Sequence, residues 1–397
     1  MGNGALQAPA GEFNFTRLER VIFGPGTVAS LGAEMERRGL RRATVVTGKT
    51  LGRSPLLERL RKALGERCVA VFTGAAQHVP AGTVRQLVAE LSSKKADTVI
   101  SFGGGSPIDT AKVALASLLG ASRDTLLAQG VGVAAAQGAG QALTHIAIPT
   151  TLSAGEYTPL GGVTEETARV KHGVMDPRLQ PRLVVNDPEL TLETPDWLWA
   201  ATGMRALDHA VEAAYSRRHQ MLTDTLAAKA IALLRDHLPI SLERRGAESI
   251  AHRGHCQLAS WFSIFGAMNT RFGISHALGH QIGPRWNVPH GVTSCITLPH
   301  VMRFMAGIAP ERFGPIAEGL GVRFDLAAAR KAALECADRV GDFIGHFGLP
   351  HTLSQAGVKR QELPEIADTV LAEVEHSKVV DRPVTRKEII ALLEAAY

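Results

Sequence analysis

Residues 97–112 have the sequence Asp97-Thr-Val-Ile-Ser-Phe-Gly-Gly-Gly-Ser-Pro-Ile-Asp-Thr-Ala-Lys112, and this stretch decides the fold of the 397-residue chain. A β-branched, apolar run ends at Phe102, three glycines follow, and Pro107 suits a first helical turn, where its missing N–H costs nothing. Such a stretch favours an anion site, because backbone N–H groups can approach the anion and the helix N-terminus is partly positive. A plain strand-to-helix bend is the alternative. We expect a phosphate group to be bound by Gly103, Gly104, Gly105 and Ser106, with Asp109 in the same first helical turn as a further binding residue.

The alternation of strand and helix continues on both sides of this stretch. Short β-branched runs predict strands, and the spacing of Val84, Leu87 and Leu91 predicts a helix over 83–94. Strand, helix and strand at this rhythm predict βαβ units and a parallel sheet. Residues 161–173 have the pattern of a β-hairpin. The predicted strands of the sheet cover residues 43–47, 69–73, 97–102, 145–149 and 183–186.

From Pro195 onward the pattern becomes helical, as in the spacing of Leu226, Ala230 and Leu233. We therefore expect an α/β domain over residues 1–190 and an all-helical domain over residues 191–397. The predicted helices begin near residue 197 and include residues 223–237, 254–269, 325–346 and 383–395.

The composition is typical of a soluble globular protein, with 45% hydrophobic and 20% charged residues. The net charge of +5 comes without a basic stripe interleaved with aromatic residues, so we expect no nucleic-acid partner. No apolar run reaches the roughly 18 residues that a membrane span needs. The four cysteines form no Cys-x-x-Cys pair and the N-terminus lacks the pattern of a signal peptide, so we expect reduced thiols in the cytoplasm.

Three histidines fall close together in the helical half, at positions 276, 280 and 290. His276 and His280 are four residues apart and so share one face of a helix, while His290 follows on a Pro-His-Gly turn. Neutral imidazole binds metals and transfers protons near neutral pH. The cluster therefore predicts a functional site. In the other half, Thr150 and Thr151 follow a predicted strand, and their hydroxyls suit either a phosphate or a turn that caps itself.

Taken together, these motifs resemble the iron-containing, or group III, alcohol dehydrogenase family, and within it the maleylacetate reductases. The resemblance implies an N-terminal dinucleotide-binding α/β domain, an all-helical C-terminal domain as in dehydroquinate synthase, and an active site between them. It also implies NAD(H) or NADP(H) as the cofactor, a small-molecule substrate and a homodimer. The matching segments are Phe23-Gly-Pro-Gly26, residues 103–112, Ile148-Pro-Thr-Thr151, Asp176-Pro-Arg178, Asp187-Pro-Glu-Leu-Thr191, Thr202-Gly-Met204 and the histidine stretch.

The resemblance also implies a set of metal ligands, from which this chain departs. Metal-dependent members bind Fe(II) or zinc through an Asp and three histidines, and His209, His276 and His290 match the histidines. The position of the Asp is Arg205, and a permanent cation there repels a metal ion. Asp208 is adjacent to His209, but one residue along a helix turns a side chain by about 100°, so we expect Asp208 to point away from the ligand set. We therefore expect no tightly held metal, although three histidines can hold zinc with one open position.

The cofactor is further constrained by two positions that the resemblance identifies. Lys171 stands where relatives have a cofactor-contacting lysine. Many NAD-specific relatives carry an Asp after the first strand of the sheet, where this chain has Gly48, with Lys49 and Arg53 nearby. We therefore expect NADP(H) to be tolerated.

The resemblance implies hydride transfer between the nicotinamide and a carbonyl or alcohol, with His280 in proton transfer. Without a metal, Arg205, His209 and His276 are expected to stabilise the substrate oxygen as fixed donors. Arg205 would also favour an oxo-acid, because guanidinium pairs bidentately with carboxylate. A structural ion pair between Arg205 and Asp208 or Glu212 is the alternative. Three other functions stay open: a Fe(II)- or zinc-dependent alcohol dehydrogenase, a non-redox NAD-binding lyase, and an inactive nucleotide-binding homologue.

Overall fold

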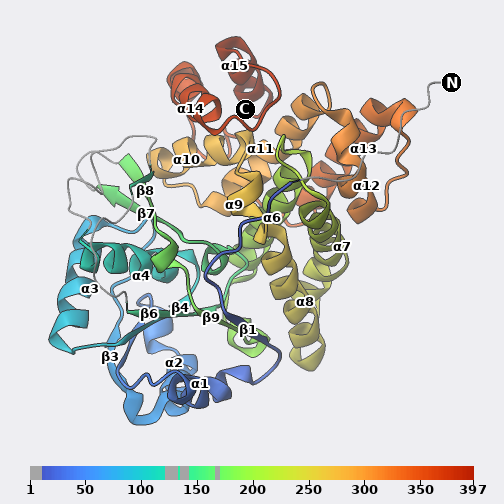
Figure 1. Ribbon diagram of the computed structural model, residues 1–397. Helices are drawn as coiled ribbons and strands as arrows, with labels where there is room; N and C mark the ends of the chain where they lie inside the picture. Colours follow the sequence, from blue (N-terminus) through green and yellow to red (C-terminus); the bar gives the residue numbers. More distant parts are fainter. Residues whose placement is uncertain (1–10, 121–132, 135–142, 166–169) are drawn as a thin grey trace.

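The computed structural model describes residues 11–120, 133–134, 143–165 and 170–397. It consists of an N-terminal α/β part and a C-terminal all-helical part, which lie against each other (Figure 1). The predicted fold class is therefore confirmed. The last strand of the large sheet ends at Asn186 and the first long helix of the second part begins at Asp196. The division at residue 190 stays a prediction, and it falls in the short connection between these elements.

The large sheet has six strands in the order β1-β9-β6-β4-β2-β3, and every neighbouring pair is parallel. Five of these strands match the predicted ones to within one residue. The sixth, β1, was not predicted; it lies at the edge and pairs only with β9. The strands are β1 (Arg20–Phe23), β2 (Ala43–Val46), β3 (Cys68–Phe72), β4 (Thr98–Gly103), β6 (Thr144–Pro149) and β9 (Leu183–Asn186).

Helices cover both faces of this sheet. Val99 of β4 packs in the cluster formed with α3 (Ala81–Ser93) and α4 (Gly105–Leu118). The neighbouring Ile100 packs in the opposite cluster, with α1 (Leu31–Arg37) and α2 (Pro55–Leu64). Because both faces are buried, the strands are apolar throughout rather than alternating. This explains why their sequences are short β-branched runs.

A smaller sheet lies beside α4. Its antiparallel pair, β7 (Leu160–Glu165) and β8 (Val170–Met175), confirms the predicted hairpin, and β5 (Val133–Ala134) pairs with β8. Lys112 of α4 fixes this region, because its buried ammonium donates to the carbonyl oxygens of Gly155 and Leu160 at 2.5 and 2.6 Å. Burial lowers the pKa of Lys112 to about 8, against the effect of Asp109 and Glu156.

The helical part is built around α6 (Asp196–Tyr215), in which every residue from Trp199 to Tyr215 is buried. A single apolar cluster joins α6 to most of the other helices. None of the helices that the structure describes combines the length and apolar composition needed to cross a membrane. All four cysteines are free. The other helices are α7 (Met221–Glu243), α8 (Gly246–Ile264), α9 (Ala267–Thr270), α10 (Ile274–Trp286), α11 (His290–Met305), α12 (Gly314–Leu320), α13 (Ala329–Gly345), α14 (Leu363–Ser377) and α15 (Arg386–Ala395).

Candidate active site

The glycine turn lies between the end of β4 at Gly103 and the start of α4 at Gly105. Gly103 has φ = 137°, in the region that favours glycine. A Cβ added to Gly104 would lie 3.1 Å from Cγ2 of Thr151, so a side chain there would press on the loop that follows β6. The turn thus leaves bare backbone at the carboxyl ends of adjacent parallel strands, the usual position for a nucleotide in doubly wound folds. These residues fit the phosphates of a dinucleotide.

Two further loops adjoin the glycine turn. Thr150 donates its backbone N–H to the carbonyl of Gly103 at 2.9 Å, which brings the buried Thr150 and Thr151 beside the turn. Gly48 accepts a backbone hydrogen bond from Gly52 at 2.9 Å, and the side chain of Leu51 in that loop lies 3.3 Å from the Cβ position of Gly103. The structure therefore brings the loops after β2, β4 and β6 together.

Asp109 and Lys171, two of the predicted cofactor ligands, are described to different extents. The carboxylate of Asp109 accepts a hydrogen bond from the backbone N–H of Gly162 at 3.2 Å, so it ties α4 to β7. Lys171 lies in β8 opposite Thr164, and its side chain is outside the part of the chain that the structure describes. The geometry thus gives Asp109 a structural contact that the sequence did not predict.

The four predicted histidines form a continuous row. The ring centroids are 5.0 Å apart for His209 and His276, 6.4 Å for His276 and His280, and 5.8 Å for His280 and His290. His209 comes from α6, and His276 and His280 from one face of α10, as predicted. His290 is the first residue of α11 rather than part of an isolated turn, because Pro289 begins that helix.

Arg205 lies against this row as a buried cation. Its Nη1 donates to Asp208 Oδ2 at 3.4 Å and to Ser294 Oγ at 3.3 Å, so the alternative of an ion pair with Asp208 is present. Burial lowers the pKa of Arg205, and Asp208 and Glu212 oppose that effect. Burial also holds the pKa values of His209 and His276 well below their usual range, with Arg205 as the next contributor for each. Burial and the charge of Arg205 therefore both disfavour the charged form of these imidazoles.

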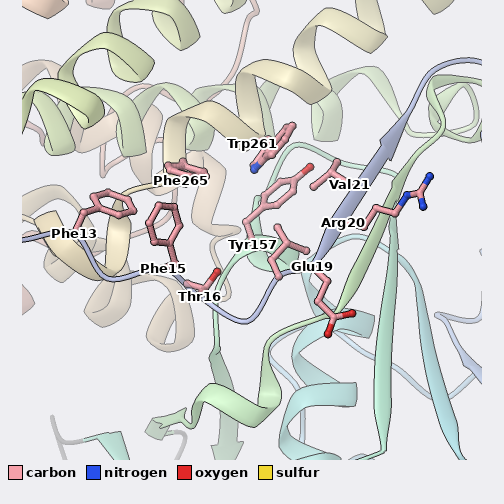
Figure 2. A pocket seen from close by; sticks show the side chains of 10 residues that line it. Phe13, Phe15, Thr16, Glu19, Arg20, Val21, Tyr157, Trp261 and Phe265 are labelled. Atoms are coloured by element: carbon pink, nitrogen blue, oxygen red, sulfur yellow. The ribbon is translucent and has the colours of Figure 1, made fainter. Parts of the chain in front are cut away.

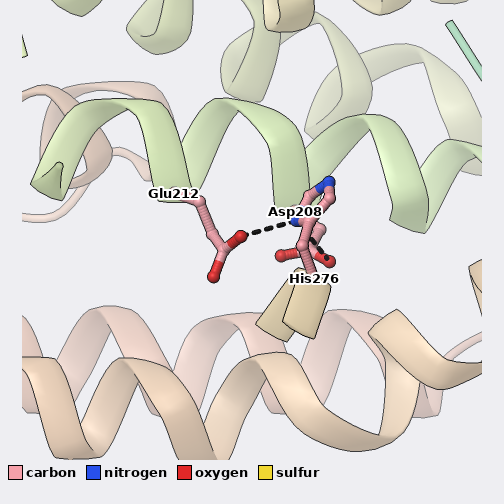
Figure 3. Close-up of side chains that lie close together, drawn as sticks. All are labelled: Asp208, Glu212 and His276. Carbon is pink, nitrogen blue, oxygen red and sulfur yellow. Dashed lines mark hydrogen bonds and ion pairs between the residues drawn. The ribbon is translucent and has the colours of Figure 1, made fainter. Parts of the chain in front are cut away.

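Asp208, Glu212 and His276 form a buried group of metal-ligand type, with one donor atom of each within 4.8 Å of the others (Figure 3). The expectation that Asp208 points away from the histidines is wrong, because its Oδ2 lies 3.8 Å from Nδ1 of His276. Asp208 lies on the face of α6 that meets α10, three residues from Arg205. Burial and the nearby Glu212 raise the pKa of Asp208 to about 7, and Arg205 opposes them.

Hydrogen bonds engage only part of this group, because the buried Oδ1 of Asp208 has no hydrogen-bond partner among the described residues. Glu212 accepts from His276 Nδ1 at 2.5 Å and from the backbone N–H groups of Gly273 and Ser275 at 2.9 and 2.8 Å. Asp208 Oδ2 accepts from the hydroxyls of Ser275 and Ser294 at 3.0 and 2.6 Å. Because a carboxylate only accepts, the ring proton of His276 is on Nδ1. Its buried Nε2 has no hydrogen-bond partner among the described residues.

Hydrogen bonds link the neighbourhood of the glycine turn to the helices that contain the histidine row. The backbone N–H of Leu152, next to Thr151, donates to Oγ1 of Thr202 at 3.1 Å, and Thr202 is one helical turn from Arg205. A second link joins His78 Nε2 to Asn287 Oδ1 at 3.1 Å, at the end of α10. The site predicted between the two parts therefore has a direct structural connection.

A cavity of about 210 Å³ lies elsewhere, beside the N-terminal segment. Figure 2 shows aromatic side chains around it, from Phe13 and Phe15 to Tyr157, Trp261 and Phe265. None of the residues predicted for the site lines this cavity. It therefore does not belong to the candidate active site.

Two carboxylate contacts of the site were not predicted. Glu212 was considered only as an ion-pair partner of Arg205, but it is three residues after His209 on α6, so helical spacing could have placed it beside the histidines. Glu373 of α14 accepts a hydrogen bond from Nδ1 of His280 at 2.6 Å, although the two residues are 93 positions apart. No local pattern could have revealed this second contact.

Comparisons with known proteins agree with the fold and the site. A model of iron-containing alcohol dehydrogenases matches residues 19–188, and a model of the C-terminal part of the Fe-containing alcohol dehydrogenase family matches residues 199–397. The chain therefore belongs to the iron-containing alcohol dehydrogenase family, and it is an oxidoreductase enzyme of that family. The resemblance seen in the sequence is confirmed at this level.

Individual relatives span nearly the whole chain. Lactaldehyde reductase of Escherichia coli (strain K12) is 30% identical over 388 residues, covering 96% of this chain and 98% of the relative. Maleylacetate reductase of Burkholderia cepacia is 31% identical over 383 residues, 96% of each chain. The crystal structure of a 1,3-propanediol oxidoreductase superposes with a TM-score of 0.89 at 28% identity, over 97% of this chain and 100% of the other. These names cover several substrates, so the branch of the family is not resolved.

Proposed function

We propose that this enzyme transfers a hydride between NAD(P)(H) and a carbonyl or alcohol group of a small oxo-acid or hydroxy acid. The observation that carries the proposal is the connection from the glycine turn through Thr151 and Leu152 to Thr202, one turn from Arg205. It supports a nucleotide bound on one side of this connection and a substrate held beside the histidine row on the other.

The nucleotide is held by the three loops at the carboxyl edge of the sheet. The nicotinamide supplies or accepts the hydride when the cofactor is bound. The backbone of the glycine turn and the N-terminus of α4 hold the phosphates. The hydroxyls of Thr150 and Thr151, in the loop after β6, lie within the same site. The proposed ligands are Gly48, Gly103, Gly104, Gly105, Ser106, Asp109, Thr150, Thr151 and Lys171.

The second part of the proposal is that no metal ion is held tightly. A divalent ion bound through Nδ1 of His276 would have to displace the proton that this nitrogen shares with Glu212. It would also lie close to Arg205, whose Nη1 is 3.4 Å from Asp208 Oδ2. Repulsion by a buried cation disfavours such an ion. The charge of Arg205 is thus the feature that disfavours a tightly held metal ion, whereas Asp208 Oδ1 and His276 Nε2 have no hydrogen-bond partner among the described residues.

In its place, Arg205 supplies the positive charge of the site. Within the described part of the chain, the hydrogen bonds of the guanidinium all start from Nη1, which leaves its other N–H groups for the substrate. A fixed donor stabilises negative charge that develops on a substrate oxygen, and a guanidinium also pairs with a carboxylate. His280 donates or accepts the proton that accompanies hydride transfer. This set favours a maleylacetate reductase-like reaction.

The direct test follows the absorbance of the reduced nicotinamide with aldehydes, ketones and oxo-acids, before and after treatment with a strong chelator. We expect net NAD(P)H consumption that is highest with an oxo-acid and unchanged by the chelator, in protein with far less than one metal per chain. Steady consumption excludes a non-redox lyase and an inactive homologue. Loss of activity on chelation, restored by Fe(II) or zinc, would contradict the metal-free part alone.

That outcome would favour the second candidate, a Fe(II)- or zinc-dependent dehydrogenase of small alcohols. One observation supports this candidate: the three donors of Asp208, Glu212 and His276 already lie within 4.8 Å of one another. His209 and His290 would complete the ligand set with His276.

The loop after β2, which contains Gly48, predicts a measurable preference between NADPH and NADH. Lys49 and Arg53 are exposed in the loop that contains Gly48, where no carboxylate repels a 2′-phosphate. We expect the double change Lys49→Ala and Arg53→Ala to lower the ratio of kcat/KM with NADPH to that with NADH by about tenfold, or about 1.4 kcal/mol. Arg61→Ala, which removes an exposed cation of α2 paired with Glu58, is the control. An unchanged ratio in the double variant would remove this loop from cofactor selection.

A further inference from the structure

Helix α14, the second-last helix of the chain, contributes a carboxylate to the histidine row. Glu373 Oε1 lies 2.6 Å from Nδ1 of His280, and its side chain is only 20% exposed. The second oxygen, Oε2, accepts from the side-chain amide of Gln281 at 3.4 Å. Both carboxylate oxygens are therefore engaged by consecutive residues of α10.

This contact determines which nitrogen of His280 carries a proton. A carboxylate only accepts hydrogen bonds, so the ring proton lies on Nδ1 and Nε2 is the nitrogen that exchanges a proton with another group. The ring is 39% exposed and stands edge-on to His276 and His290, with interplanar angles of 83° and 80°. A ring with this exposure needs a fixed partner to keep one orientation.

Glu373 also acts on the buried cation of the site. Burial lowers the pKa of Arg205, and the charge of Glu373 is among those that oppose this effect, after Asp208 and Glu212. The carboxylate of α14 is thus close enough to influence both groups proposed to meet the substrate. By contrast, Glu365 of α14 pairs with Arg285 of α10 at 3.0 Å and is 71% exposed.

We propose that Glu373 is a positioning residue that fixes the tautomer and orientation of His280 for proton transfer, so that α14 completes the active site. The inference rests on the proposed role of His280 in the reaction. Carboxylates that orient a metal-ligating histidine contribute about 10-fold to 100-fold, and we expect an effect of the same order for the orientation of His280.

Kinetic comparison of Glu373→Ala, Glu373→Gln and Glu365→Ala provides the test. We expect Glu373→Ala to lower kcat at least about tenfold, with an unchanged KM for the nucleotide and a larger solvent deuterium isotope effect on kcat. Glu373→Gln should recover part of the loss, because its amide oxygen still accepts a hydrogen bond. Glu365→Ala removes a carboxylate that links the same two helices and should behave as the unchanged enzyme.

A structural measurement separates this inference from the proposed function. Histidine-selective ¹⁵N NMR, with the His280 signal assigned from His280→Ala, should show the Nδ1-protonated ring in the unchanged protein and a mixture of tautomers in Glu373→Ala. Slow turnover in His280→Ala together with normal turnover in Glu373→Ala would overturn the positioning role alone. Equal losses in Glu365→Ala and Glu373→Ala would also overturn it, because helix docking would then explain both. Normal turnover in His280→Ala would instead overturn the proposed role of His280.

Discussion

Arg205→Met is expected to lower kcat by about 10²-fold to 10³-fold, the usual loss when a fixed donor to a developing negative charge is removed. Methionine has a similar length and removes the charge without leaving a large cavity. The hydroxyls of Ser275 and Ser294 still donate to Asp208 in this variant. Steady-state kinetics with the best oxo-acid, together with the melting temperature, measure the effect.

A second buried arginine of the helical part provides the matched control. Arg253 is 2% exposed, donates to the carbonyl of Thr191 at 2.7 Å and stacks on Trp199. Arg253→Met should lower the melting temperature while kcat stays within a factor of about two. If Arg205→Met loses stability but keeps its turnover, the arginine has only the structural role of an ion pair with Asp208.

The variant Arg205→Asp tests whether the charge of Arg205 prevents metal binding. It removes the cation and supplies the carboxylate that metal-dependent relatives have four residues before His209. We expect this variant to bind close to one zinc or Fe(II) ion per chain, whereas the unchanged protein binds far less. Elemental analysis after gel filtration measures this, and a metal-free Arg205→Asp variant would show that more than the cation prevents metal binding.

His280→Ala is expected to lower kcat by about 10²-fold or more, the contribution typical of a positioned general acid or base. The affinity for the nucleotide should not change, because His280 belongs to α10 of the helical part and is not among the proposed nucleotide ligands. Binding of the reduced nucleotide by fluorescence and turnover with the oxo-acid separate the two effects. His300→Ala, a change in the adjacent helix α11, is the control, and unchanged turnover in His280→Ala would exclude the proton-transfer role.

Most of the fold could be predicted because local patterns of apolar residues indicate its strands and helices. Strands buried on both faces are continuous apolar runs, and the helices have a repeating apolar face. The edge strand β1 is different, since it has four residues and only its pairing with β9, more than 150 positions away, defines it. Such pairing leaves no trace in a short window of sequence.

The candidate site also contains some residues that local sequence could identify and others that only the packing of helices brings together. Glycine and threonine loops follow predicted strands, and His276 and His280 share a helical face, so both groups could be found from sequence. The contacts of Asp208 and Glu373 could not, because they depend on how α6 and α14 pack against α10. Asp208 in particular was placed on the wrong side, since a single helix was considered without its neighbour.

The hydrogen bonds between Glu212 and the start of α10 affect the local stability of this helix. One carboxylate of α6 accepts hydrogen bonds from the backbone N–H groups of Gly273 and Ser275, which couples α6 to the start of α10. The backbone N–H of Leu152 donates across the two parts to a neutral hydroxyl, which is a weaker acceptor than a carboxylate. We therefore expect the amide hydrogens of Gly273 and Ser275 to exchange more slowly than that of Leu152.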